Sequence, residues 1–132
     1  MKSPQWVLPE TVLALHERLL TEFGGMDGLR GEALLVSALA RPRQLLAYGK
    51  LDIFALAAAY AFGLARNHPF VDGNKRIGFT TSVLFLELNG HSFTASEADA
   101  TLNTLALAAG ELSESGYAEW LKKNSRRSRR PE

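Results

Sequence analysis

Apolar residues recur every three or four positions along most of the chain, and no alternating stretch longer than four residues occurs. The first apolar stripe begins after Pro9, a residue favoured in the first turn of a helix. It predicts a helix over about 9–23, which Gly24 ends. A weaker stripe predicts a second helix over about 32–41, which Pro42 stops because proline lacks a backbone N–H.

Two segments in the middle of the chain are apolar on nearly every side. From Ile53 to Ala65 every residue is apolar or glycine, and Asp52 stands where it can cap the helix. A similar helix is predicted over about 74–88, which Asn89 and the glycine after it end. Helices without a polar face belong in a protein interior, so these two should form the centre of the fold.

The last third of the chain predicts two more helices. Ser96, with an acidic residue three positions later, approximates a capping box for a helix over about 97–110. A final helix should start at Ser113 or Ser115, and residues 91–95 should form an extended connector. No convincing strand is predicted. The expected fold is all-α, a compact single-domain bundle of about six helices in which the two central apolar helices flank one loop.

The composition is that of an ordinary globular domain. The chain has 132 residues, 46% of them hydrophobic and 22% charged, which fits one sizeable core. Cysteine is absent, which excludes disulfides and cysteine metal sites and fits the cytoplasm. The N-terminus lacks the apolar core of a secretory signal, and no run reaches the ~20 apolar residues that span a bilayer.

Charge is distributed unevenly. Residues 1–121 hold 9 Lys+Arg and 13 Asp+Glu, a net charge of −4, whereas residues 122–132 hold 6 Lys+Arg and one glutamate, a net charge of +5. We therefore expect a folded domain over 1–121 and a basic, disordered tail over 122–132. No aromatic residue interleaves the basic block, so specific nucleic-acid binding is not expected.

Candidate chemistry is concentrated in residues 68–79, HPFVDGNKRIGF, between the two central helices. Histidine is the residue type whose ordinary pKa lies near neutrality, so His68 is the candidate general base. Asp72 could hold Mg²⁺ together with phosphate oxygens. Lys75 and Arg76 fall in the first turn of a helix, where cations oppose the helix dipole unless an anion binds there. Each residue alone has an ordinary structural explanation, but together they match the needs of phosphoryl transfer.

Other residues of the stretch should shape the loop. Pro69 turns His68 away from helical dihedrals, so the preceding helix should end near residue 67 or 68. Phe70 should be a buried anchor, and Gly73 should allow a tight turn. Asn74, or the aspartate two positions before it, should cap the next helix.

The stretch resembles the motif of the Fic/Doc family, His-x-Phe-x-Asp/Glu-Gly-Asn-Gly/Lys-Arg. The adenylylating branch of that family has glycine after the asparagine and a second arginine three residues beyond the first. Here Lys75 and Phe79 occupy those positions, and both differences point to the Doc branch, the toxins of toxin–antitoxin pairs. The matching residues are His68, Phe70, Asp72, Gly73, Asn74, Lys75 and Arg76.

The resemblance implies a role for each matching residue. His68 would be the catalytic base and Asp72 the Mg²⁺ ligand. Gly73, Asn74, Lys75 and Arg76 would bind the phosphates of ATP. In Doc-type members the lysine is expected to reverse ATP, so that its γ-phosphate is transferred to a threonine of elongation factor Tu and translation stops. A cognate antitoxin would inhibit the toxin through a C-terminal segment bound near the active site.

Three other functions remain open from the sequence. The chain could be an adenylylating Fic enzyme, a catalytically silent binding partner, or an RNA-cleaving toxin, the last suggested only by the basic tail. An inhibitory Ser/Thr-x-x-x-Glu-Gly/Asn helix is not found, because Trp120 follows Ser115 and Glu119 where glycine or asparagine is expected.

Residues outside the motif receive weaker interpretations. His16 is expected to be structural or solvent-facing, and Arg30, in the glycine-rich loop 24–31, is expected to lie on the surface instead of reaching the site. Residues 42–51 are interpreted as an irregular connector or short helix. By resemblance this segment would contain the flap that aligns the target, with contacts from Arg43, Tyr48 and Lys50.

Overall fold

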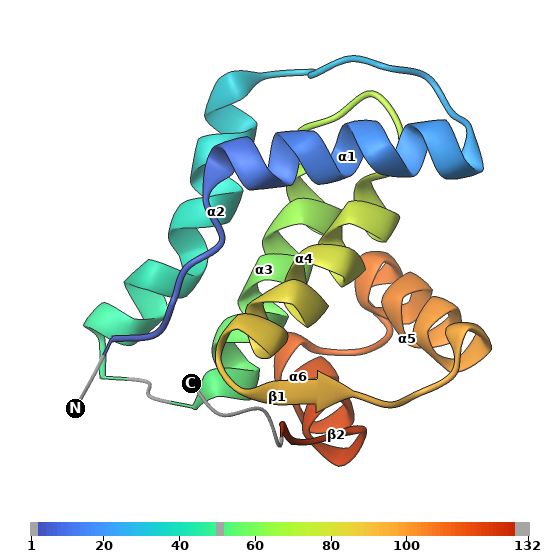
Figure 1. Cartoon of the computed structure of the whole chain (residues 1–132). Coiled ribbons are helices and arrows are strands. Elements are labelled where there is room, and N and C mark those ends of the chain that lie inside the picture. The colour runs from blue at the N-terminus through green and yellow to red at the C-terminus, as the bar shows by residue number, and fades with distance from the viewer. Residues whose placement is uncertain (1–2, 50–51, 129–132) are drawn as a thin grey trace.

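Six helices and two short strands make up the part of the chain that the structure describes. The structure is a computed structural model and describes residues 3–49 and 52–128. The elements in chain order are α1 (Pro9–Phe23), α2 (Glu32–Ala47), α3 (Ile53–Asn67), α4 (Asn74–Leu88), β1 (His91–Phe93), α5 (Glu97–Ala109), α6 (Glu114–Lys123) and β2 (Ser125–Arg127). This order confirms the predicted helical bundle (Figure 1).

Side-chain caps that the sequence predicted start three of the helices. The Asp52 carboxylate accepts from the N–H of Phe54 at the start of α3. Ser96 caps α5 and Ser113 caps α6 in the same way, each accepting a backbone N–H three positions on. These bonds satisfy amide groups that the first turn of a helix leaves free, so the sequence placed these helix starts correctly.

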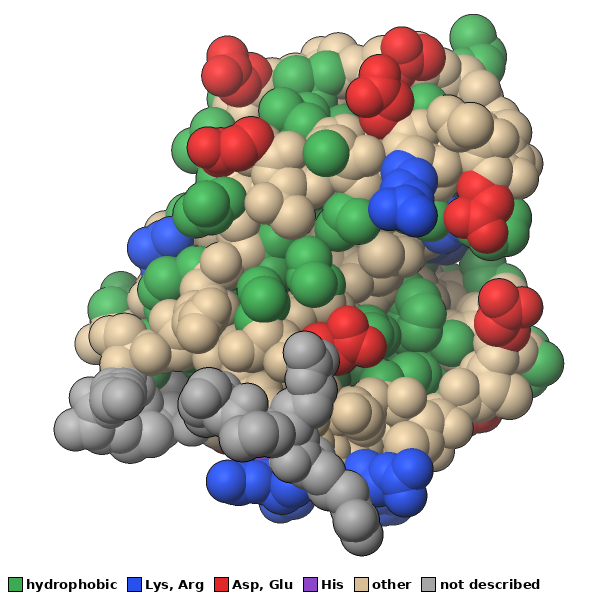
Figure 2. Space-filling view, in the orientation of Figure 1, with side chains coloured by type: hydrophobic (Ala, Val, Ile, Leu, Met, Phe, Trp, Pro, Cys, Tyr) green, Lys and Arg blue, Asp and Glu red, His purple; other side chains and the backbone are tan. Residues whose placement is uncertain are grey.

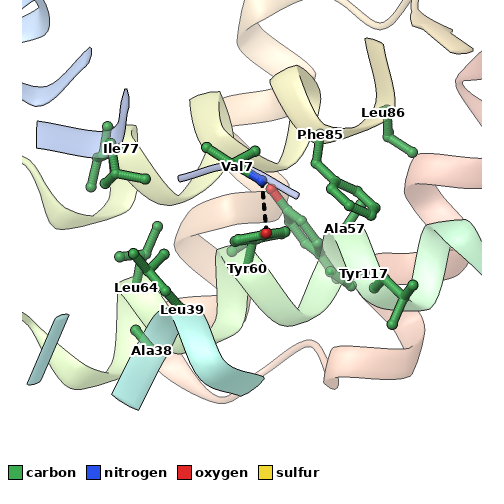
Figure 3. Close-up of a cluster of buried hydrophobic side chains, with 14 of the residues drawn as sticks. Val7, Ala38, Leu39, Ala57, Tyr60, Leu64, Ile77, Phe85, Leu86 and Tyr117 are labelled. Atoms are coloured by element: carbon green, nitrogen blue, oxygen red, sulfur yellow. Dashed lines mark hydrogen bonds between the residues drawn. The ribbon is translucent and has the colours of Figure 1, made fainter. Parts of the chain in front are cut away.

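Helices α3 and α4 lie at the centre of the bundle, and glycine lets them approach closely. A Cβ atom at Gly78 of α4 would lie 3.1 Å from the carbonyl oxygen of Ala61 in α3. The N–H of Val7 donates to the buried Tyr60 hydroxyl, which ties the N-terminal segment to this core (3.0 Å; Figure 3). The core also includes Leu39, Leu56, Leu64, Phe70, Ile77, Phe85, Leu86, Leu107, Tyr117 and Leu121.

Helix α2 continues through Pro42 to Ala47, so the predicted end near residue 41 was wrong. Proline at position 42 leaves the carbonyl of Ala38 without its usual helical donor. That carbonyl packs against Gly63 of α3, where a Cβ would lie only 2.9 Å from the oxygen. Packing of the buried side of α2 against α3 therefore outweighs the local cost of the proline. Residues 50–51 of the expected connector lie outside the described residues.

The strands β1 and β2 pair antiparallel, with Ser92 opposite Arg126. The sequence predicted neither strand. Within the segment expected to be a disordered tail, Lys122 and Lys123 form the end of α6, and β2 follows after Asn124. Residues 129–132 lie outside the described residues. A strand of three residues has too short a pattern to be recognised in a sequence, and its partner lies over 30 positions away.

The two ends of the molecule differ in charge. Helix α1 crosses the end at which α3 and α4 are joined, and the strand pair lies at the opposite end (Figure 1). Acidic side chains gather over the α1 end, whereas basic side chains gather at the strand end (Figure 2).

Among the described residues no helix is both long and apolar enough to cross a membrane.

Candidate active site

The loop between α3 and α4 begins with a strained histidine. Helix α3 ends at Asn67, as predicted, and His68 adopts the left-handed conformation, with φ 51° and ψ 57°. Among the described residues it is the only one other than glycine with a positive φ. Such a conformation costs on the order of 1–3 kcal/mol and persists only where other contacts hold it. We call residues 68–73 the motif loop.

Arg30 supplies part of that support. Its Nη1 donates to the carbonyl oxygen of His68 at 2.8 Å, and its backbone N–H donates to Pro69 at 2.6 Å. The expected surface role of Arg30 is therefore incomplete: the side chain is exposed, yet it holds the motif loop. The neighbouring glycines were the signal in the sequence, because they allow close approach of two backbones.

The glycine-rich loop 24–31, which we call the frame loop, runs along the motif loop. The N–H of Val71 donates to Gly28 at 2.9 Å, and Leu29 forms an isolated antiparallel bridge with Phe70. Gly28 has φ +135°, and a Cβ there would lie 2.9 Å from Val71. Only glycine fits at this point, so the frame loop can pack directly against the motif loop and support it.

Phe70 is the buried anchor that the sequence predicted, since 2% of its surface is exposed. Its ring stacks on His16 of α1, with centroids 3.7 Å apart and planes inclined by 11°. The Nε2 of His16 also lies 2.8 Å from the carbonyl oxygen of Asp72. From the sequence, His16 was expected to be structural or solvent-facing and to have no part in the site. Its place on the apolar stripe of α1, four positions after Val12, was the available signal.

Asn74 organises the loop from the opposite side. Its Oδ1 accepts from the N–H of Phe70 at 3.0 Å, and its Nδ2 donates to the Phe70 carbonyl at 2.9 Å. The side chain is buried. The predicted cap was wrong, because Gly73, with φ 80°, is the N-cap of α4 and no side chain caps the helix.

Asn74 also reaches the candidate base. Its Nδ2 lies 3.3 Å from Nδ1 of His68. The two bonds to Phe70 fix the amide orientation, so Nδ2 is the donor and Nδ1 the acceptor. The neutral His68 ring then carries its proton on Nε2. To receive a proton at Nε2, the ring must instead carry its own proton on Nδ1, and Nδ1 then no longer accepts from Asn74. This contact is longer than a strong hydrogen bond and therefore costs little to lose.

The Asp72 carboxylate is held by two backbone amides. Its Oδ1 accepts from Gly73 at 2.8 Å and its Oδ2 from Met26 of the frame loop at 3.2 Å. Each oxygen keeps lone-pair capacity for a cation. No group of three or more His, Cys, Asp or Glu side chains that could hold a metal ion occurs within the described ranges. A single carboxylate with phosphate oxygens and water is nevertheless a donor set that fits Mg²⁺.

Lys75 and Arg76 project from the first turn of α4, and both are exposed. The first backbone bond of α4 runs from the N–H of Ile77 to Gly73, so three amides precede it without an intrahelical acceptor. In the part of the chain that the structure describes, no carboxylate lies within ion-pair distance of either cation. The Arg76 guanidinium instead lies 4.4 Å from the centre of the Phe23 ring. The combination of free amides and unneutralised cations can bind an anion.

A cavity of about 650 Å³ opens beside this helix end. One side is formed by residues 72–76, and the other side is a mainly apolar groove between α1, α4 and α5 that also includes Thr80, Glu97 and Thr101. His68 does not line the cavity. Phe79, at the position of the second arginine in the resemblance, packs against Phe93 at 5.5 Å and forms part of the groove wall. Further lining residues are Leu19, Phe23, Val83, Ala100 and Leu105.

The expected flap residues are not brought to this cavity. Arg43 lies over the ring of Trp6 at 4.9 Å, and Tyr48 is exposed at the end of α2 that is remote from Gly31 and the motif loop. Lys50 lies outside the described residues. Within the described residues, the segment that flanks the motif loop is the frame loop.

Comparison with known proteins identifies relatives for most of the chain. The profile of the Fic/DOC family matches residues 6–86. The "Protein kinase doc" of Escherichia phage P1 is 33% identical over 118 residues, which cover 89% of this chain and 93% of that protein. The "Toxin Doc" of Mycolicibacterium smegmatis is 43% identical over 77 residues, which cover 55% of this chain and 58% of that toxin.

Proposed function

The chain belongs to the Fic/Doc family, and from this premise we propose that it is a Doc-type toxin with protein kinase activity. It would transfer the γ-phosphate of ATP to a protein hydroxyl, with Mg²⁺ bound at Asp72. The observation that carries the proposal is the unneutralised pair Lys75 and Arg76 at the open N-terminus of α4, beside that carboxylate. The names of the two relatives agree with it.

The chemistry can be assigned to this chain's own residues. The hydroxyl oxygen of the target attacks the γ-phosphorus, the bond to the bridging oxygen breaks, and ADP leaves with the electron pair. His68 takes the hydroxyl proton. Lys75, Arg76 and the free amides of α4 hold the phosphates and stabilise the charge that develops on them. Bound Mg²⁺ would neutralise phosphate charge next to Asp72.

Lys75 favours phosphoryl over adenylyl transfer. A lysine side chain cannot occupy the same volume as a phosphate group, so it closes space that a glycine would leave open for the nucleotide. Phe79 supports the same choice, because it puts an aromatic ring where a second arginine would bind phosphate. Adenylyl transfer remains the competing activity, and the transferred group distinguishes the two.

We propose elongation factor Tu as the target, with a threonine as the modified residue and the cytoplasm as the place of action. The test is the intact mass of elongation factor Tu after incubation with this protein, ATP and Mg²⁺. We expect the gain of one phosphate, lost with His68→Ala. Gain of an AMP group would establish the adenylylating activity instead. No change in mass would reject this target.

The apolar groove suggests how a cognate antitoxin would act. It begins at the phosphate-binding residues and includes the exposed side chains of Phe23 and Leu105. A C-terminal antitoxin segment with apolar side chains could fill it and block the site. Leu105→Glu should weaken inhibition by a co-expressed antitoxin and leave phosphate transfer unchanged. Full inhibition of that variant would place the antitoxin elsewhere.

A further inference from the structure

The buried His16 lies under the motif loop, although the chemistry proposed above gives it no task. Its side chain is 4% exposed and comes from α1, far from the motif in sequence. Its Nε2 lies 2.8 Å from the carbonyl oxygen of Asp72. Because a carbonyl oxygen only accepts, Nε2 carries the proton and His16 is the donor.

That hydrogen bond acts on one end of a single peptide group. The Asp72 carbonyl and the Gly73 N–H belong to the same planar unit. His16 holds its oxygen, and the Asp72 carboxylate accepts from its N–H at 2.8 Å. The orientation of the peptide is therefore fixed from both sides.

Gly73 makes this orientation easy to lose. It has φ 80°, and glycine populates both signs of φ at little cost, so the peptide before it can rotate. A rotated peptide would turn its carbonyl oxygen from His16, which does not line the cavity, toward the residues that do. A carbonyl oxygen there would repel phosphate, and the Gly73 N–H would leave the carboxylate of Asp72.

We propose that His16 is a positioning residue that locks the Asp72–Gly73 peptide with its carbonyl directed away from the anion site. This inference rests on the proposed function of that site. Stacking on Phe70 fixes the plane of the imidazole ring, and the ring then aims Nε2 at the carbonyl. Loss of the donor should weaken nucleotide binding even where the aromatic packing is kept.

Two variants separate the donor from the ring. His16→Phe keeps an aromatic ring against Phe70 and removes the hydrogen bond. His16→Gln loses the stacking but places an amide N–H at a similar reach. Val12→Ala, one turn earlier on the same helix and fully buried, is a control for general loss of packing.

The measurements are ATP binding by calorimetry and the exchange rate of the Gly73 amide by NMR in the ligand-free protein. We expect His16→Phe to weaken ATP binding about 10- to 100-fold, the range for losing a group that orients a ligand-binding residue. It should also speed Gly73 exchange. His16→Gln should recover most of both losses, and Val12→Ala should change neither.

Two results would overturn the proposal. One is His16→Phe with wild-type ATP binding and Gly73 exchange. The other is Val12→Ala matching His16→Phe in both readouts, since the effect would then be general packing. If the wild-type protein binds ATP but phosphorylates no target, the proposed kinase activity fails, while these two readouts still decide the role of His16.

Discussion

Two pairs of basic side chains lie at helix ends in this molecule, and the two pairs have opposite relations to the dipole of their helix. Lys75 and Arg76 occupy the first turn of α4, where cations are disfavoured. Lys122 and Lys123 occupy the last turn of α6, where cations are favoured. The second pair stabilises its helix without a ligand, whereas the first pair needs an anion to remove the conflict.

The two groups of basic side chains also differ in their surroundings. The α4 end is fixed by long-range bonds from Arg30, His16 and the frame loop, and it borders a cavity of about 650 Å³. The strand end presents Arg126 and Arg127 on a short strand, both exposed. A cation held against its electrostatic preference by distant parts of the chain indicates a binding site better than a large local charge does.

Among these changes, Asn74→Ala should have the largest effect on stability and activity at the α4 end. It leaves the buried N–H and carbonyl of Phe70 unpaired, which should cost about 1–3 kcal/mol of unfolding free energy. Phosphate transfer should fall by about two orders of magnitude, since the motif loop loses its geometry. Denaturant unfolding and initial rates measure both. Asn103→Ala on α5, whose side chain bonds only to Asp99 in the described structure, is the control and should keep its activity.

A matched pair of lysine substitutions compares the two ends directly. Lys75→Ala should raise the KM for ATP by about 10- to 100-fold, the equivalent of one hydrogen bond to a charged group. Lys122→Ala removes the same charge at the other end and should leave the KM unchanged. Steady-state kinetics at fixed salt test this. Equal effects of the two changes would mean that general charge, and not the α4 site, attracts the nucleotide.

Neutralising β2 should have a smaller effect. The double change Arg126→Ala with Arg127→Ala keeps the backbone pairing with β1, so unfolding free energy should change by less than about 1 kcal/mol. The phosphate-transfer rate should stay within about twofold of wild type. A large loss of rate would show that the strand end contributes to the reaction, and the two ends would then not differ in function.

The smallest expected effect concerns His91, opposite Arg127 in the strand pair. Burial lowers the pKa of His91, and the charge of Arg127 lowers it further. The folded state therefore favours the neutral ring, so its stabilising contribution is complete above the ordinary pKa and is lost as pH falls through the lower folded value. Arg127→Ala should raise the pKa of His91 in an NMR titration. An unchanged value would leave burial as the whole cause.

Much of the fold followed from local patterns in the sequence. The continuous apolar run of α3 predicted a central buried helix, Asp52 and Ser96 marked helix starts correctly, and Ser113 was one of the two starts predicted for the last helix. Pro42 misled the prediction because its helix is held by packing against Gly63, a contact that no local rule contains. The strand pair was missed because it, too, depends on a contact between residues far apart in the sequence.

The sequence by itself determined the helical fold, the motif and its family, because apolar spacing and a dense run of polar residues are local properties. Tertiary structure alone decided which distant residues serve the motif. His16 and Arg30 each looked ordinary in sequence, yet both donate to the motif loop. A strained loop is stable only when groups far along the chain hold it, and folding alone brings those groups together.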